Sequence, residues 1–211
     1  MNISFAITVK DEVEEVKRLI PLLDQHLKEG DEIVVLCDDR GPSEIWEYLC
    51  NFKGKGYNNQ NYRYVESKGK FNNDFAEWKN KLNELCLNDF IVNIDADEYP
   101  SDIFLENIHE LLKENPECEA YWVPRENYVE GLTPEWIDKW GWRVDKLGRV
   151  NYPDAQLRVF KRDYERIKWK NKVHEQLTGY KFVSALPEEF CFIHKKSLGR
   201  QINQNNFYNT L

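Results

Sequence analysis

The first hundred residues alternate short apolar runs with amphipathic helical patterns, and this alternation limits the possible folds more than any other feature of the chain. Four apolar runs are typical of buried strands: 3–9, 32–37, 62–66 and 90–94. Four stretches carry helical signals: 13–27, 43–50, 75–86 and 101–113. The alternation predicts an α/β fold with a Rossmann-like, mostly parallel central sheet and helices on both faces.

The second half of the chain is organised differently. Short strands are predicted over 120–123 and 156–160, and the stretch 130–152 between them is rich in Trp and Gly with few periodic signals. We interpret that stretch as a long functional loop or a small subdomain. The tail from Lys195 onward is polar and Asn-rich, and 53–61 is predicted to be a loop. With 211 residues, the chain is expected to form one large domain.

Charge and composition argue against several classes of protein. The formal net charge of −8 disfavours a nucleic-acid-binding protein, because such proteins usually present a basic face. No apolar run reaches the roughly 18 residues of a transmembrane helix, and the first residues lack the features of a secretory signal. The five Cys are scattered without a CxxC pair, as expected for reduced thiols in a cytoplasmic protein. Any membrane contact is therefore expected to be peripheral.

The acidic sequence Asp95-Ala96-Asp97 directly follows the apolar run 90–94. Two carboxylates this close to the end of a buried strand are costly to place together without a cation. Mg²⁺ and similar ions take one or two protein carboxylates and complete their coordination with phosphate oxygens and water. Ligands of parallel α/β sheets bind beyond the carboxyl ends of the strands, which strengthens the metal-site interpretation. The alternative, an ordinary acidic turn, stays open.

Asp38 and Asp39 end the second predicted strand, where a carboxylate can accept hydrogen bonds from a ribose or a nucleobase. A solvated turn is the other interpretation. The glycine signature of dinucleotide-binding folds is absent after the first strand, where Val9-Lys10-Asp11-Glu12 stands instead. Neither a P-loop nor the G-x-S-x-G elbow of hydrolases occurs in the chain. Asp11 and Glu14 have the spacing of a helix capping box.

Several segments, in this order, resemble the family 2 glycosyltransferases. The stretch 3–12 is similar to their opening strand, 31–39 to the strand that ends in a nucleotide-contacting Asp, and 75–80 to a helix that usually carries Arg where this chain has Lys79. Asp95-Ala96-Asp97-Glu98 matches their metal motif. Gln156–Phe160 and Lys172–Glu175 resemble the branch that includes lipopolysaccharide-core glucosyltransferase-like proteins. The chain departs from the usual pattern after Asp38, where Asp39-Arg40-Gly41-Pro42-Ser43 follows.

The resemblance implies a GT-A fold and a sugar transfer from a nucleoside diphosphate sugar, for which we expect a UDP-sugar, to a hydroxyl of a glycan or glycolipid. It implies a single-step reaction with inversion and a Mn²⁺ or Mg²⁺ ion on Asp97, helped by Asp95. The half 1–100 would bind the nucleotide-sugar, and 101–211, with its polar tail, the acceptor. The donor-binding residues implied are Val9, Lys10, Glu12, Asp38, Asp39, Lys79, Asp95 and Ala96.

A general base must take the proton of the attacking hydroxyl. We prefer Glu175 for this role and interpret His174 as a polar orienting or phosphate-contacting group, with Asp154 as a third candidate. Six Lys or Arg in the twelve positions 161–172 could hold phosphate or an acidic acceptor, or form a solvated face. His194, at the end of a late strand, is either a third metal ligand or a structural histidine.

Four of the seven Trp lie between positions 121 and 142. Tryptophan faces stack on the C–H faces of sugars, although Trp is more often largely buried. Trp136, Trp140 and Trp142, in the polar stretch, are the acceptor-binding candidates, whereas Trp122 is expected to be a core residue.

Other functions were weighed against a glycosyltransferase. A sugar-nucleotide nucleotidyltransferase shares this type of sheet but normally carries a Gly-rich, basic loop after the first strand, which this chain lacks. A non-catalytic module that binds a nucleotide or carbohydrate stays open. A metal-dependent nuclease is disfavoured by the net charge.

Overall fold

The structure is a computed structural model that describes residues 1–54, 56 and 62–208. The loop predicted over 53–61 therefore lies mostly outside the described residues, as do the last three residues of the tail. All five Cys are free thiols, which agrees with the expectation of reduced cysteines.

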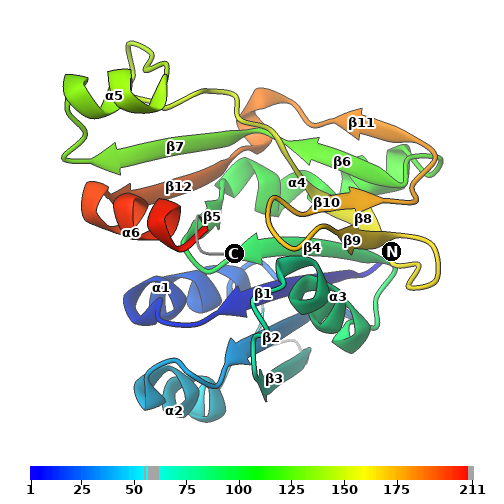
Figure 1. The fold of residues 1–211 in the computed structure, drawn as a ribbon. Coiled ribbons are helices and arrows are strands. Elements are labelled where there is room, and N and C mark those ends of the chain that lie inside the picture. The colour runs from blue at the N-terminus through cyan, green and yellow to red at the C-terminus, as the bar shows by residue number, and fades with distance from the viewer. Residues whose placement is uncertain (55, 57–61, 209–211) are drawn as a thin grey trace.

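A seven-stranded sheet forms the centre of the molecule (Figure 1). Its strands run in the order β11 (Val183–Ala185), β6 (Ala120–Val123), β8 (Gln156–Lys161), β4 (Phe90–Asp95), β1 (Ile3–Val9), β2 (Glu32–Asp38) and β3 (Arg63–Gly69). Only β8 runs against its neighbours. The predicted mostly parallel sheet is confirmed. Because β8 pairs with β4, the two halves of the sequence share one sheet.

Helices cover both faces of this sheet, as the alternation predicted. Side chains on a strand alternate between the faces, so Phe5 and Ile7 pack with the helices α1 (Val13–Asp24), α2 (Ser43–Asn51) and α4 (Asp102–Glu114). Ala6 faces the other side, which is covered by α3 (Phe75–Leu85) and by the hairpin of β9 (Lys168–Lys170) and β10 (Gln176–Thr178). The side chains of Ser101 and Asp74 cap α4 and α3 by accepting backbone N–H groups.

A second, smaller sheet lies beside the first (Figure 1). It consists of β5 (Glu98–Pro100), β12 (Phe192–Ser197) and β7 (Arg125–Glu130), and β12 is preceded by a short 3-10 turn, η2 (Glu188–Phe190). The stretch 130–152 contains α5 (Pro134–Trp140) and a bridge between Val144 and Val150, so it is a small subdomain rather than a loop.

The polar tail forms the helix α6 (Leu198–Tyr208), which lies between the small sheet and α1 in Figure 1. Its sequence has only one fully buried side chain, Gln201, and this explains why apolar periodicity did not predict a helix. Within the described residues, none of the helices has the length and apolar character required to cross a membrane.

Candidate active site

A cavity of about 1390 Å³ opens at the carboxyl ends of β1, β2 and β4. This is the edge where ligands bind in sheets of this type. The volume exceeds the range of about 300–1,000 Å³ typical of pockets for one small molecule, so the cavity has room for two substrates. The sequence-predicted residues that line it are Val9, Lys10, Glu12, Asp38, Lys79, Asp95, Ala96, Asp97, Trp142, Asp154, His174, Glu175 and His194.

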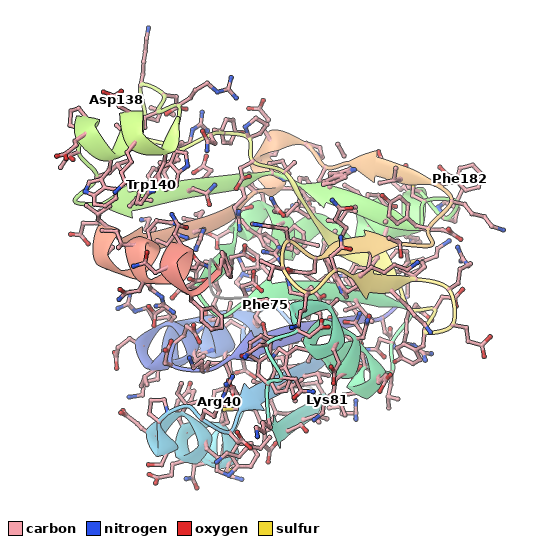
Figure 2. All side chains as sticks on the ribbon, viewed as in Figure 1. Arg40, Phe75, Lys81, Asp138, Trp140 and Phe182 are labelled. Carbon is pink, nitrogen blue, oxygen red and sulfur yellow. The ribbon has the colours of Figure 1, made fainter. Side chains whose placement is uncertain are left out.

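Three predicted residues lie elsewhere. Asp39 is exposed and does not line the cavity. Trp136 and Trp140 are half-buried on α5, outside the lining, and Figure 2 shows Trp140 well away from Phe75 and Arg40. The three tryptophans nevertheless form one cluster of tilted rings, because the centroid of the Trp140 ring lies 4.7 Å from that of Trp136 and 4.5 Å from that of Trp142.

The turn after β1 is held tightly against the turn after β2. Gly41 packs so closely on the backbone carbonyl of Lys10 that an added Cβ would lie 1.9 Å from its oxygen. The carboxylate of Glu12 folds back to accept the N–H groups of Lys10 and Asp11 at 2.8 and 3.1 Å. The capping box predicted for Asp11 and Glu14 therefore does not form. Glu12 stabilises the turn itself, and its burial raises the pKa of its carboxyl.

Asp95 faces two cations. Its Oδ2 accepts from Arg158 Nη2 at 2.6 Å, and its Oδ1 lies 3.6 Å from Lys79 Nζ. Burial opposes the charge of Asp95, but the attraction of Arg158 and Lys79 outweighs it and holds the pKa of the carboxyl far below its usual range. Both oxygens of Asp95 therefore have protein partners, although the sequence predicted this residue to help bind a metal.

A chain of ion pairs connects Asp95, through Arg158, Glu98 and Arg125, to Asp154. Glu98 is fully buried and accepts from Arg158 Nη2 at 2.5 Å and from Arg125 Nη1 at 2.9 Å. Arg125 also donates to Asp154 Oδ2, at 2.5 Å from Nη2 and 3.0 Å from Nε. A buried charge is tolerated only when it is paired, and here each arginine bridges two carboxylates. The arginines therefore hold Asp95, Glu98 and Asp154 in fixed positions.

Asp97 and His194 form the other pair of the site. His194 Nε2 lies 3.2 Å from Asp97 Oδ2, and His194 Nδ1 lies 2.9 Å from Asn127 Oδ1. The amide of Asn127 is oriented by Asp154, which accepts its Nδ2 at 2.6 Å. Since an amide oxygen only accepts, Nδ1 carries a proton, and a neutral ring then presents the lone pair of Nε2 towards Asp97. Two such electron-rich atoms attract a proton or a cation.

The donor set suits a divalent metal that takes part of its coordination from a substrate. One carboxylate and one imidazole are ligands for Mn²⁺ and related ions, and the Asn127 contact orients the imidazole as an outer-shell partner does in metal sites. Among the residues that the structure describes, no three His, Cys, Asp or Glu side chains form a complete metal site. Asp97 and His194 therefore fit an ion whose remaining ligands are phosphate oxygens and water.

The three base candidates have different surroundings. Glu175 Oε1 lies 2.6 Å from Lys79 Nζ, so one ammonium group links it to Asp95. The Oδ2 of Asp154 accepts hydrogen bonds from Arg125 and Asn127, whereas its Oδ1 accepts, among the described residues, from Gln156 alone, at 3.4 Å. His174 is exposed, and its ring forms a T-shaped pair with the Tyr208 ring, with the two centroids 5.8 Å apart. The structure brings all three to the cavity.

Two cations of the cavity were not predicted from the sequence: Arg200, on α6, and Lys196, on β12. Arg200 donates to Glu12 at 2.6 Å and to Glu15 at 2.8 Å, which joins the end of the chain to the start of α1. Lys196, at the end of β12, donates to Gln204 at 2.9 Å, and burial lowers the pKa of its ammonium to about 8. Both cations line the cavity. Neither residue belongs to a motif, so the sequence showed that they are basic but not that they lie at the cavity.

One expectation about the second half was wrong. Trp122, predicted to be a core residue, is 39% exposed and lines the cavity. It lies where the pairing of β6 with β8 is irregular, and Leu157 rather than Arg158 is its partner. The six Lys and Arg side chains of 161–172 do not line the cavity. The residue of this stretch that does is Trp169. Arg166, for example, pairs with Glu119 at 2.8 Å.

Comparison with known proteins identifies the family of this chain. The family model described as Glycosyl transferase family 2 matches residues 4–180. The chain belongs to glycosyltransferase family 2. The matched range includes the Asp95-Ala96-Asp97 motif and all three base candidates, Asp154, His174 and Glu175, whereas His194 and α6 lie beyond it.

Solved structures of S. aureus TarS share the fold of this family 2 chain. The structure of TarS residues 1–349 has a TM-score of 0.60 at 13% sequence identity and covers 92% of this chain and 60% of that one. The same protein in complex with UDP-GlcNAc has a TM-score of 0.61 at 14% sequence identity, and the match covers 93% of this chain and 59% of that one. In complex with UDP it has a TM-score of 0.59 at 12% identity, and the match covers 98% of this chain and 64% of that one. At this identity the likeness shows the GT-A fold. The chain spans about three fifths of these TarS structures. No curated protein sequence matches it.

Proposed function

We propose that the chain is an inverting, metal-dependent glycosyltransferase that transfers a sugar from a UDP-sugar to a hydroxyl of a glycan or glycolipid. The observation that carries this proposal is the pair Asp97 and His194 at the carboxyl edge of the sheet, beside a cavity large enough for two substrates. Membership of family 2 supports it, and the neighbours solved with UDP and UDP-GlcNAc support the choice of donor.

Asp97 and His194 are the residues that would hold Mn²⁺ or Mg²⁺, with Asp95 beside them. When bound, the ion supplies positive charge that offsets the charge developing on the leaving diphosphate. The chain itself contributes cations to the same cavity. Lys79, Lys196 and Arg200 line it, and Lys79 is held in place between Asp95 and Glu175. These groups would orient the diphosphate and favour its departure.

In the transfer step, the acceptor oxygen attacks the anomeric carbon as the bond from that carbon to the phosphate oxygen breaks. The bonding electrons leave with the diphosphate, and the acceptor proton passes to a carboxylate. We assign this proton to Glu175, because the Lys79 contact fixes its carboxylate next to Asp95. Asp154 is the alternative, through its Oδ1. His174 would contact phosphate or orient the acceptor.

The acceptor would bind in the part of the cavity lined by Trp142, whose ring contacts Trp140, which in turn contacts Trp136. Trp122 adds a second exposed indole to the same cavity. Indole faces favour the C–H faces of sugar rings, which suits a glycan or a glycolipid head group. The resemblance of Gln156–Phe160 and Lys172–Glu175 supports the further proposal that the chain belongs to the lipopolysaccharide-core glucosyltransferase-like branch.

Calorimetric titration of UDP, GDP and CMP, each with Mn²⁺ and with EDTA, tests the donor and metal assignments. We expect metal-dependent binding of UDP to the wild type and loss of that binding in Asp97→Ala, because the variant lacks one of the two protein ligands. Glu106→Ala, which removes an exposed acid on α4, is the matched control. UDP affinity in Asp97→Ala equal to wild type would show that the metal assignment is wrong.

Glu175→Gln tests the base. The amide keeps the size of the side chain and cannot take the proton, so we expect UDP binding within about twofold of wild type and transfer reduced by roughly 10²–10⁴-fold. Transfer at the wild-type rate in this variant would move the base to Asp154. Nucleotide binding without any turnover in the wild type would instead favour the non-catalytic binding module.

A further inference from the structure

A short hairpin, 144–150, projects from the molecule beyond α5 (Figure 1). Its first and last residues form an antiparallel bridge, and the N–H of Gly148 closes its turn by donating to the carbonyl of Asp145 at 3.0 Å. Leu147 lies at the tip and is 69% exposed, more than any other large hydrophobic side chain among the described residues.

The turn holds Leu147 in a fixed position. The carboxylate of Asp145 accepts the backbone N–H groups of Leu147 and Arg149, both at 2.9 Å, and also accepts Arg149 Nε at 2.7 Å. Gly148 has a φ of 81°, which glycine adopts without strain. These contacts involve only the backbone of Leu147, so the hairpin does not require an apolar side chain at its tip.

The hairpin and the neighbouring α5 carry cations that have no carboxylate partner. Three exposed basic side chains form no ion pair with any residue that the structure describes: Lys139, Arg143 and Lys146. In a chain with a formal net charge of −8, the segment 139–149 has four basic side chains and one acid, Asp145, which pairs with Arg149 at 2.7 Å. The two acids of α5 before this segment are Glu135 and Asp138. The hairpin is therefore a locally basic part of an acidic protein.

The hairpin starts from the wall of the candidate active site. Val150 lines the cavity, and its N–H donates at 2.8 Å to the carbonyl of Asn127, the residue that contacts His194. Trp142, just before the hairpin, lines the cavity as well. Leu147 is three residues from Val150, a span of about 10 Å in extended chain. A surface that binds the tip would therefore lie close to the cavity.

A lipid bilayer suits these features better than a protein partner does. A specific protein interface buries about 800 Å² on each side, whereas the hairpin offers two exposed apolar side chains, Leu147 and Val144, flanked by cations. A bilayer needs no complementary shape, because an apolar side chain enters its interface while Lys and Arg contact anionic head groups.

We propose that the hairpin is a membrane-docking site for the surface of an anionic bilayer. Leu147 enters the boundary between head groups and acyl chains, and Lys139, Arg143 and Lys146 contact lipid phosphates. Docking would hold the cavity next to the head groups. The inference goes beyond the proposed function and does not depend on it, because binding to a bilayer requires neither nucleotide nor turnover.

Co-sedimentation with vesicles tests the site. The vesicles consist of phosphatidylcholine alone, or of phosphatidylcholine and phosphatidylglycerol in equal amounts. We expect the wild type to bind the mixed vesicles at least about tenfold more tightly than the neutral ones, because each basic residue near an anionic surface contributes about fivefold. Salt at about 1 M should remove most of this difference, because it shortens the Debye length to about 3 Å.

Leu147→Asp tests the apolar contact. Its affinity for the mixed vesicles should fall at least about tenfold, because the variant loses the burial of a leucine side chain. Leu87→Asp is the matched control. Leu87 is 58% exposed, but it precedes β4, at the opposite end of the sheet from the cavity, and it lies between the acids Glu84 and Asp89 in the sequence. This variant should bind as the wild type does.

The double variant Arg143→Gln with Lys146→Gln tests the cations. Its preference for the mixed vesicles should fall by roughly tenfold or more, because two of the three proposed phosphate contacts are lost. Arg18→Gln with Lys113→Gln removes the same charge from exposed positions on α1 and α4 and should keep the wild-type preference.

Several outcomes would overturn the inference. It is wrong if the wild type binds neither kind of vesicle, or if Leu147→Asp or the double variant binds as the wild type does. Equal losses in Leu147→Asp and Leu87→Asp would show that any exposed leucine has the same effect. Self-association of the wild type that Leu147→Asp abolishes, without vesicle binding, would assign the tip to a second copy of the chain.

Two further measurements keep the interpretation clear. The thermal melting and UDP titration of Leu147→Asp should match those of the wild type, which shows that the variant is folded and that its cavity is intact. A wild type that binds mixed vesicles but no nucleotide would remove the proposed function and leave the membrane-docking site standing.

Discussion

At the scale of single residues, the site depends on two arginines, Arg158 and Arg125, to which the sequence analysis assigned no role. Arg158 is buried and Arg125 is half-buried; the two share Glu98 between them, and their other ion pairs are with Asp95 and Asp154. Arginine suits this task because its planar fork can bind two carboxylates at once and stays charged when buried. The attraction of Asp95 and Glu98 raises the pKa of Arg158 further, despite its burial.

Arg158→Met should therefore destabilise the protein strongly. Methionine fills a similar volume but leaves Asp95 and the fully buried Glu98 without their shared cation, and breaking a buried pair costs about 3–5 kcal/mol. The free energy of unfolding from urea titration measures the effect. Arg162→Met, which loses a hydrogen bond to the carbonyl of Asn88 and a contact with the Tyr164 ring but no carboxylate partner, is the control and should change it by much less. A loss below about 1 kcal/mol in Arg158→Met would mean that water or a rearranged Arg125 replaces the pair.

At the scale of elements, an ion pair joins three segments of the second half. Arg166, before β9, donates to Glu119, before β6, at 2.8 Å from both Nη1 and Nη2. The backbone N–H of Lys181, which precedes β11, donates to the same carboxylate at 2.6 Å. These contacts lower the pKa of Glu119 to about 2, and the hydrogen bond from Arg166 is the main cause. The edge of the sheet is thereby fastened to the β9–β10 hairpin.

Glu119→Gln should lower stability in a pH-dependent way. Because the folded-state pKa lies below the ordinary value of 4.5, ionised Glu119 stabilises the protein above pH 4.5, and this contribution is lost as the pH falls towards 2. We expect a loss of about 1–2 kcal/mol at pH 7 and a smaller difference from wild type at pH 3, measured by urea unfolding. Glu106→Gln should show no such trend. A difference that stays constant across this range would assign the effect to packing rather than to charge.

At the scale of the whole molecule, the candidate site draws on both halves of the chain. The cavity takes Asp38 and Asp97 from the first half and Arg125, His194 and Arg200 from the second. Arg200 contacts Glu12 across 188 positions of sequence. A ligand in this cavity should therefore stabilise the molecule as one unit, because both halves contribute to its binding.

UDP with Mn²⁺, at about 100 times its Kd, should stabilise the folded state by about 2.7 kcal/mol. For a chain of this size the corresponding rise in Tm is about 5–10 °C, in a single transition. Differential scanning calorimetry measures it, and EDTA in place of Mn²⁺ should remove most of the shift. Two separate transitions, of which only one moves, would show that the halves unfold independently.

The sequence was sufficient for the parallel strands of the first half and for the residues at their carboxyl ends. Apolar periodicity is local, so it identified β1, β2 and β4, and the direction rule for parallel strands then placed Asp38, Asp95 and Asp97 at one edge. The order of the motifs also indicated the family, which the match over residues 4–180 confirms.

The partners of those residues were decided by the tertiary structure. His194 meets Asn127 across 67 positions, and Arg158 meets Asp95 across 63. The local periodicity of apolar residues cannot predict a contact between residues so far apart in the sequence. The exposure of Trp122 and the helix formed by the polar tail depend in the same way on distant segments: β8 is irregular opposite Trp122, and Arg200 is held by Glu12 and Glu15. Local sequence specifies on which face of a strand or helix a side chain lies. The partner that it contacts there depends on which distant segment of the chain packs against that face.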